Sequence, residues 1–100
     1  MEMHQIIYFL VLCEERNFTR AAERCGVAQP SLTKAIKKLE LKLGGALFYR
    51  DKFETKLTKL GNLVKPRLQK IRFEAECAHV VARKFSANSF MKVTTILPRL

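Results

Sequence analysis

The sequence predicts a mostly α-helical domain with three short helices, a two-stranded hairpin and one long helix. Apolar residues recur at intervals of three and four through most of the chain, and glycine or proline separates the segments in which they recur. One short stretch instead has a strand-like pattern. With 100 residues, of which 48% are hydrophobic, the chain is long enough to form one small core.

Two helices are expected at the N-terminal end. Apolar residues with the spacing of one helix face are Ile6, Phe9, Leu10 and Cys13. They predict a first helix from Met3 to Arg16. Thr19 is a candidate N-cap for a second helix from Arg20 to Cys25, and Gly26 ends that helix.

A third helix and a hairpin follow. Pro30 suits the first turn of a helix because its missing N–H would have no partner there. The predicted buried stripe of this helix is Leu32, Ile36, Leu39 and Leu43. Gly44 and Gly45 terminate it. Residues 46–49 and 55–58 flank a polar stretch and predict a short two-stranded hairpin.

The last predicted helix is long and has an apolar seam. The seam residues are Leu60, Val64, Leu68, Ile71, Ala75, Ala78, Ala82 and Phe85, which recur every three or four positions. A helix from Thr58 to about Ser86 would be about 42 Å long, which is longer than the folded part that precedes it. Its seam would therefore need a second helix to cover it, most simply the same helix of another chain. Pro66 predicts either a kink or a helix that begins later than Thr58.

The C-terminal end resembles the start of another domain. Residues 91–97 are rich in β-branched residues, and Pro98 follows them. A lone strand has no sheet to join. We therefore expect residues 88–100 to begin a further domain that this chain lacks.

The charge of the chain points to an anionic partner. The net charge is +10, and residues 31–72 hold twelve Lys and Arg against three Asp and Glu. Such a concentration favours nucleic acid over acidic protein or lipid. Three widely spaced cysteines indicate neither a disulfide framework nor a zinc site, and they fit a reducing cytoplasm. No leader and no apolar run near the roughly 20 residues of a membrane span is present, so a cytoplasmic protein is expected.

Small and apolar residues around the second and third helices predict a helix-turn-helix. They are Ala21, Ala22, Cys25, Gly26, Val27, Leu32 and Ala35. The stretch FTRAAERCGVAQPSLTKAIKKLELKLGGALFYR, followed by LTKLG, resembles the N-terminal domain of LysR-type transcriptional regulators. In that family an aromatic-S/T-x-A-A start, a Q-P turn, L-E-x-x-L-G, L-F-x-R and L-T-x-x-G occur in this order.

The resemblance implies an architecture and a function. Residues 1–58 would be a winged helix-turn-helix domain, residues 59–87 a linker helix that pairs in a dimer, and residues 88–100 the start of an effector-binding domain. It also implies sequence-specific binding to double-stranded promoter DNA, a small-molecule effector bound by the missing domain, a tetramer in the full-length protein, and no catalysis, metal or cofactor.

Twelve residues are candidates for DNA contact: Thr19, Arg20, Gln29, Pro30, Ser31, Thr33, Lys34, Lys37, Lys38, Arg50, Lys52 and Lys56. Gln29 can pair with adenine, Thr33 can touch a thymine methyl group, and Lys34 can reach guanine. Family members commonly use the residues that match Gln29, Pro30, Thr33 and Lys34 in the major groove, although Ser and Arg are usual at the last two positions.

The predicted hairpin departs further from the family pattern. Arg50 and Lys56 match basic positions that contact phosphate, whereas Phe53 replaces an arginine at the hairpin tip and Glu54 stands where glycine is common. Lys52 is the cation that could replace the missing arginine.

Other interpretations stay open from the sequence. Lys34, Lys37 and Lys38 could form only a solvated face, Gln29 could be a helix cap, and Arg50 could pair with Asp51 or Glu54. Cys25 fits a small core residue better than a redox sensor, and His4 and His79 have no metal-ligand companions. A protein-interaction module built on the apolar seam is the rival function. An enzyme is remote, because no nucleophile with a base and no glycine-rich phosphate loop is present.

Overall fold

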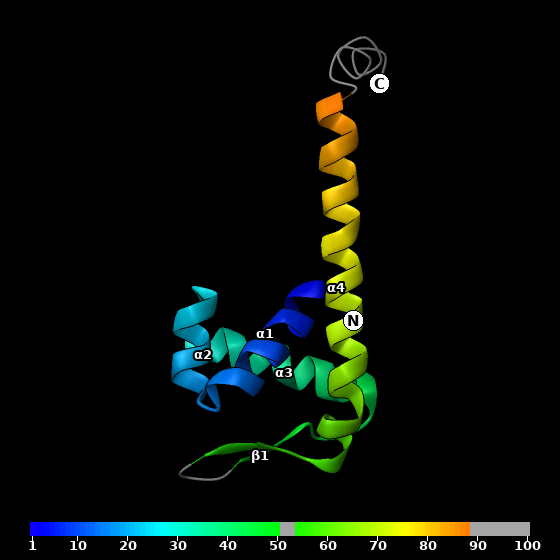
Figure 1. The fold of residues 1–100 in the computed structure, drawn as a ribbon. Coiled ribbons are helices and arrows are strands. Elements are labelled where there is room, and N and C mark those ends of the chain that lie inside the picture. The colour runs from blue at the N-terminus through cyan, green and yellow to red at the C-terminus, as the bar shows by residue number, and fades with distance from the viewer. Residues whose placement is uncertain (51–53, 89–100) are drawn as a thin grey trace.

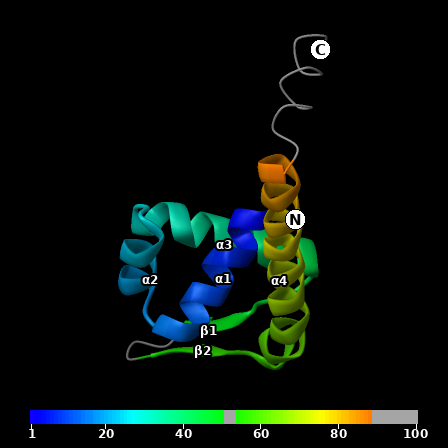
Figure 2. The ribbon, with the colours of Figure 1, turned by 45° about the horizontal axis from the view of Figure 1, so that its top comes forward.

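The computed structural model describes residues 1–50 and 54–88. Its elements, in chain order, are α1 (Met3–Glu15), α2 (Phe18–Cys25), α3 (Gln29–Leu43), β1 (Phe48–Arg50), β2 (Thr55–Leu57) and α4 (Lys59–Asn88). Helices α1, α2 and α3 form the head, the hairpin extends from it, and α4 projects beyond it (Figures 1 and 2). The predicted winged helix-turn-helix followed by a long helix is confirmed.

The core lies where the three head helices meet the hairpin and the first turns of α4. Its largest fully buried side chains are Ile6, Phe9, Leu12, Leu32, Ile36, Leu39 and Leu47. Phe48 of β1 lies against Phe9, with ring centroids 5.4 Å apart, and Leu68 of α4 is only 3% exposed. Hairpin and long helix therefore share one core with the helix-turn-helix.

The turn between α1 and α2 differs from the prediction. α1 ends at Glu15, and Arg16 takes the left-handed conformation (φ 55°). The N-cap of α2 is Asn17 and not Thr19, because the Asn17 Oδ1 accepts the Arg20 backbone N–H at 2.8 Å. α2 consequently begins at Phe18, whose ring packs on the core 6.5 Å from that of Phe48.

α3 follows its predicted course. Pro30 lies in the first turn, and Gly44 ends the helix with a φ of 85°, a value that glycine adopts without strain. Leu32, Ile36 and Leu39 of the predicted stripe are buried, and Leu43 is half-buried. Ala28 is the N-cap, so the interpretation of Gln29 as a cap is wrong.

The hairpin is antiparallel, and its register pairs Phe48 with Leu57, Tyr49 with Lys56, and Arg50 with Thr55. At its base, the Thr58 backbone N–H donates to the Leu47 carbonyl at 2.9 Å. The Thr58 hydroxyl donates to the Ala46 carbonyl and accepts the Gly61 N–H at 3.0 Å. Thr58 thus joins the end of β2 to both the α3–β1 loop and the first turn of α4.

α4 begins at Lys59 and continues through Pro66 as one helix (Figure 1). The helix thus starts one residue after Thr58, within the predicted alternative of a later start, and Pro66 lies inside it. Leu60, Val64 and Leu68 pack on the core on both sides of the proline, which holds the first turns of the helix in place. Apart from Asn88, the predicted start of a further domain at 88–100 lies outside the described residues, as does the predicted strand at 91–97.

Candidate nucleic-acid interface

The exposed face of α3 gathers most of the predicted contact residues. Opposite the buried stripe the helix presents Gln29, Pro30, Ser31, Lys34, Lys37 and Lys38, all of which are exposed. Thr33 is half-buried at the edge of this face. The first turn therefore offers an amide and a hydroxyl, and the next two turns offer ammonium groups, which is the combination that base edges and phosphates can accept.

The single carboxylate of α3 is turned away from this face. Glu40 accepts the Leu47 backbone N–H at 2.7 Å and lies 3.3 Å from the Arg50 guanidinium, and its side chain is only 13% exposed. Its charge is therefore used between α3 and β1. An anion that approaches the lysines of α3 meets no carboxylate of the same helix.

The N-terminal end of α2 places two further candidates in solvent. Thr19 and Arg20 are both exposed. Arg20 donates to the Glu15 carbonyl at 3.0 Å, and its Nε lies 3.6 Å from the Glu15 carboxylate. Since the Arg20 side chain remains 62% exposed, these contacts orient the guanidinium without covering it.

The hairpin presents its residues on two faces. Directly opposed residues of an antiparallel pair share a face, so Lys56 lies beside Tyr49, and both are exposed. Arg50 and Thr55 lie on the other face, the same one as the buried Phe48. Tyr49 is 61% exposed but is not among the predicted contact residues, although alternation along the strand places it on the face opposite to that of Phe48.

Arg50 has a specific partner that the sequence reasoning did not identify. Its guanidinium lies 3.3 Å from Glu40 and stacks over the Phe18 ring, 4.9 Å from the centroid. Glu54 instead pairs with Arg16 at 3.1 Å, so the interpretation that joined Glu54 to Arg50 is wrong. Lys52, Phe53 and Asp51 lie outside the described residues.

The apolar seam of α4 divides into two parts. Leu60, Val64 and Leu68 contact the chain's own core. Farther along, Ala75 is half-buried, and the exposed members are Ile71, Ala78, Ala82 and Phe85. The part of the predicted seam that remains uncovered therefore begins at Ile71.

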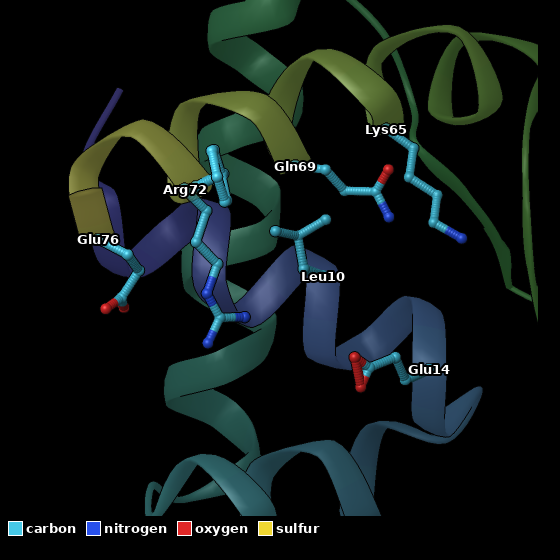
Figure 3. A pocket seen from close by; sticks show the side chains of 7 residues that line it. Leu10, Glu14, Lys65, Gln69, Arg72 and Glu76 are labelled. Carbon is cyan, nitrogen blue, oxygen red and sulfur yellow. The ribbon is translucent and has the colours of Figure 1, made fainter.

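A shallow groove of about 350 Å³ separates α1 from α4 (Figure 3). It is lined by Leu10, Glu14, Lys65, Gln69, Arg72, Phe73 and Glu76. Two carboxylates and two cations alternate around it, so it lacks the one-sided charge of α3.

Cys13 and Cys25 pack against the core. Burial raises the pKa of the Cys13 thiol to about 11 and also raises the pKa of Cys25. Both effects keep the thiols protonated, which agrees with Cys25 as a small core residue. Within residues 1–50 and 54–88, no group of three or more His, Cys, Asp or Glu side chains could hold a metal ion. No helix in this part of the chain is long and apolar enough to span a bilayer.

Comparisons with known proteins agree with this geometry. The family profile described as "Bacterial regulatory helix-turn-helix protein, lysR family" matches residues 3–62. The Hca operon transcriptional activator HcaR of Escherichia coli (strain K12) is 39% identical over 84 residues, which are 84% of this chain and 28% of HcaR. CatR of Pseudomonas putida is 36% identical over 89% of this chain and 28% of its own length. This chain spans between 21% and 43% of the lengths of the curated relatives it matches.

Two solved protein–DNA complexes contain a chain that resembles the fold. The BenM_DBD/catB site 1 DNA complex matches with a TM-score of 0.81 and 29% identity, over 86% of this chain and 97% of that one. The CbnR_DBD–DNA complex matches with a TM-score of 0.80 and 30% identity, over 86% of this chain and 99% of that one. This chain belongs to the LysR family of bacterial transcriptional regulators, a non-enzymatic family, and has the winged helix-turn-helix fold of the BenM and CbnR DNA-binding domains.

Proposed function

We propose that this chain binds double-stranded promoter DNA in a sequence-specific manner as a homodimer, with α3 in the major groove. The observation that carries the proposal is the exposed face of α3, where Lys34, Lys37 and Lys38 stand free of the helix's one carboxylate. A helix of this kind fits the major groove, and phosphates attract its ammonium groups. The DNA complexes of BenM_DBD and CbnR_DBD, which share the fold, support it.

Within the proposed complex, base recognition belongs to the first turns of α3. Gln29 offers the donor and acceptor pair that adenine requires, Thr33 a hydroxyl and a methyl group, and Lys34 a donor for guanine. Lysine is a point donor without the guanidinium fork, so preference at the Lys34 base is looser than an arginine would give. Pro30 and Ser31 lie beside these groups and complete the surface in the groove.

Phosphate contacts surround this surface. Lys37 and Lys38 follow on the same exposed face, and Thr19 and Arg20 add a hydroxyl and a guanidinium at the start of α2. From the hairpin we assign Arg50, Lys52 and Lys56 to phosphate. Such contacts supply affinity and orientation more than sequence preference.

The proposed dimer uses the outer half of α4. Ile71, Ala75, Ala78, Ala82 and Phe85 form one side of this half, and Phe85 is 64% exposed. Apolar side chains repeated at heptad-like spacing on a projecting helix are covered most simply by a second copy of that helix. Leu60, Val64 and Leu68 are reassigned from the dimer contact to packing within the chain, because they already contact the core.

The same proposal extends to the whole protein. Residues 1–58 form the DNA-binding domain and residues 59–87 the linker, with an effector-binding domain from about residue 88 that takes a small molecule. A tetramer of the full-length protein and a cytoplasmic location belong to this proposal as well.

The salt dependence of DNA affinity tests the proposal. A dimer that neutralises about six to ten phosphates loses about 10³- to 10⁵-fold in affinity between about 50 and 200 mM salt. The measurement is fluorescence anisotropy with a duplex selected from a random pool. Affinity that does not change with salt would contradict the proposal and favour a protein-interaction module instead.

A further inference from the structure

We propose that Glu40 is a positioning residue for the hairpin, which holds Arg50 and β1 at a fixed place relative to α3. The inference rests on the proposed function, because the contact that it positions is one with DNA. It assigns a role to a residue that lies outside the proposed DNA-facing surface.

The Glu40 carboxylate connects two elements. One Glu40 oxygen accepts the Leu47 backbone N–H at 2.7 Å, and the other lies 3.3 Å from the Arg50 guanidinium. Its side chain is only 13% exposed, whereas that of Arg50 is 43% exposed. Charge-assisted bonds are stronger when one partner is shielded from water. Glu40 therefore connects the last turns of α3 to Leu47 and Arg50, the first and last residues of the segment 47–50 that contains β1.

The loop between α3 and β1 is also held by bonds that do not involve the Glu40 carboxylate. The backbone carbonyl of Glu40 accepts the N–H groups of Gly44 and Gly45, at 2.9 and 3.0 Å. From the other side, the Thr58 hydroxyl donates to the Ala46 carbonyl at 2.6 Å. These bonds hold the loop whatever the charge at position 40. Loss of the Glu40 charge should therefore release Arg50 while the loop keeps its course.

The Arg50 guanidinium is oriented by its contacts and still exposed. Its guanidinium stacks 4.9 Å from the centre of the Phe18 ring, so Glu40 and Phe18 constrain it from two elements. A guanidinium has five N–H donors, and the described bond to Glu40 takes one of them. Its exposure leaves room for a phosphate to accept others. Pre-orientation of this kind reduces the entropy lost when the phosphate binds.

The sign of the effect separates positioning from simple charge. Glu40→Gln removes a negative charge from a chain of net charge +10, so general electrostatics predicts tighter DNA binding. Positioning predicts weaker binding, because Arg50 would lose its fixed orientation. Glu23→Gln is the matched control, since Glu23 is exposed and forms no ion pair within the described residues.

The experiment is a double-mutant cycle of Glu40→Gln and Arg50→Gln, measured as affinity for a selected duplex by fluorescence anisotropy over a range of salt. We expect Glu40→Gln to weaken binding roughly three- to fivefold, as for a partly exposed ion pair. It should also lower the salt slope toward that of Arg50→Gln, by at most about 1.8, which is about 0.9 for each of the two Arg50–phosphate contacts of the dimer. In the Arg50→Gln background the same change should cause no loss of affinity, and Glu23→Gln should bind at least as tightly as the wild type. Urea unfolding confirms that each variant is folded.

Two outcomes would overturn the inference: unchanged or tighter binding by Glu40→Gln, or the same loss of affinity with and without Arg50. Should Glu40→Gln fail to fold, Glu40→Asp in the wild-type and Arg50→Gln backgrounds decides, because the shorter side chain keeps the charge but withdraws the carboxylate from the Arg50 guanidinium. Positioning then predicts a loss of affinity only where Arg50 is present, and charge alone predicts no loss in either background. A wild-type chain that binds no duplex would instead contradict the proposed function itself.

Discussion

Replacement of Gly61 by alanine perturbs the point where α4 leaves the hairpin. A Cβ at this position would overlap the Leu47 carbonyl oxygen and lie 2.7 Å from a methyl group of Leu57. Since ordinary contacts are about 3.5 Å, α4 and the backbone of Leu47 in the α3–β1 loop would have to separate by about 1 Å. The same oxygen accepts the Thr58 N–H, and the Gly61 N–H donates to the Thr58 hydroxyl, so the separation would also strain these bonds.

The expected change in the free energy of unfolding combines one stabilising effect of Gly61→Ala with two destabilising effects. Glycine to alanine within a helix ordinarily stabilises by about 1 kcal/mol. Overpacking costs about 1–3 kcal/mol, and each strained hydrogen bond contributes about 1 kcal/mol. We expect Gly61→Ala to lower the free energy of unfolding by about 3 kcal/mol and Tm by about 15 °C.

Circular dichroism during urea and thermal unfolding measures this change. Gly26→Ala is the comparison, because Gly26 has a φ of 70° but no atom within 4 Å of the place a methyl group would take, so only backbone strain of about 1 kcal/mol is expected. A Gly61→Ala variant as stable as the wild type, or more stable, would refute the close approach of α4 to the Leu47 carbonyl.

The remaining predictions concern DNA contact, the dimer and the cysteines. Gln29→Ala and Lys34→Ala should each cost about 1–3 kcal/mol of DNA binding and relax the preference for particular bases, whereas Lys56→Ala should weaken binding to all sequences alike. Selection from random DNA pools measures both affinity and base preference. Uniform losses at all three positions would contradict the division into base and phosphate contacts. The double variant Ile71→Glu and Phe85→Glu should have the mass of a monomer by light scattering. Phe73 is 63% exposed on another side of α4, so Phe73→Glu should leave the dimer intact. An unchanged mass in the double variant would exclude this seam as the dimer contact. Because the folded chain holds the pKa of Cys13 near 11, an unfolded thiol ionises first and stability falls as pH rises from about 9 to 11. Cys13→Ala should reduce that fall in urea unfolding at pH 8 and 10.5, and an identical fall would contradict the burial argument.

The order of the elements could be predicted because local patterns determine it. Leu32, Ile36 and Leu39 repeat at helical spacing, and Gly44 supplies the left-handed residue that ends α3. The exposed face of α3 followed directly, since a helix that buries one stripe leaves the opposite side in solvent.

The sequence could not predict the contacts that depend on tertiary packing. Asn17 and Thr19 are both capping residue types, and the burial of Phe18 favours the earlier start of α2. Arg50 pairs with Glu40, ten positions away, because the α3–β1 loop folds back on the helix. The seam of α4 divides at about Leu68 because the head covers its first turns, which periodicity along one helix does not reveal.

A crystal structure of this chain with a duplex selected from a random pool tests the central claim most directly. The account predicts two chains joined along α4, with Gln29, Thr33 and Lys34 of each against base edges in major grooves about 34 Å apart, or a multiple of that distance. DNA bound on another surface, with this face of α3 in bulk solvent, would contradict it.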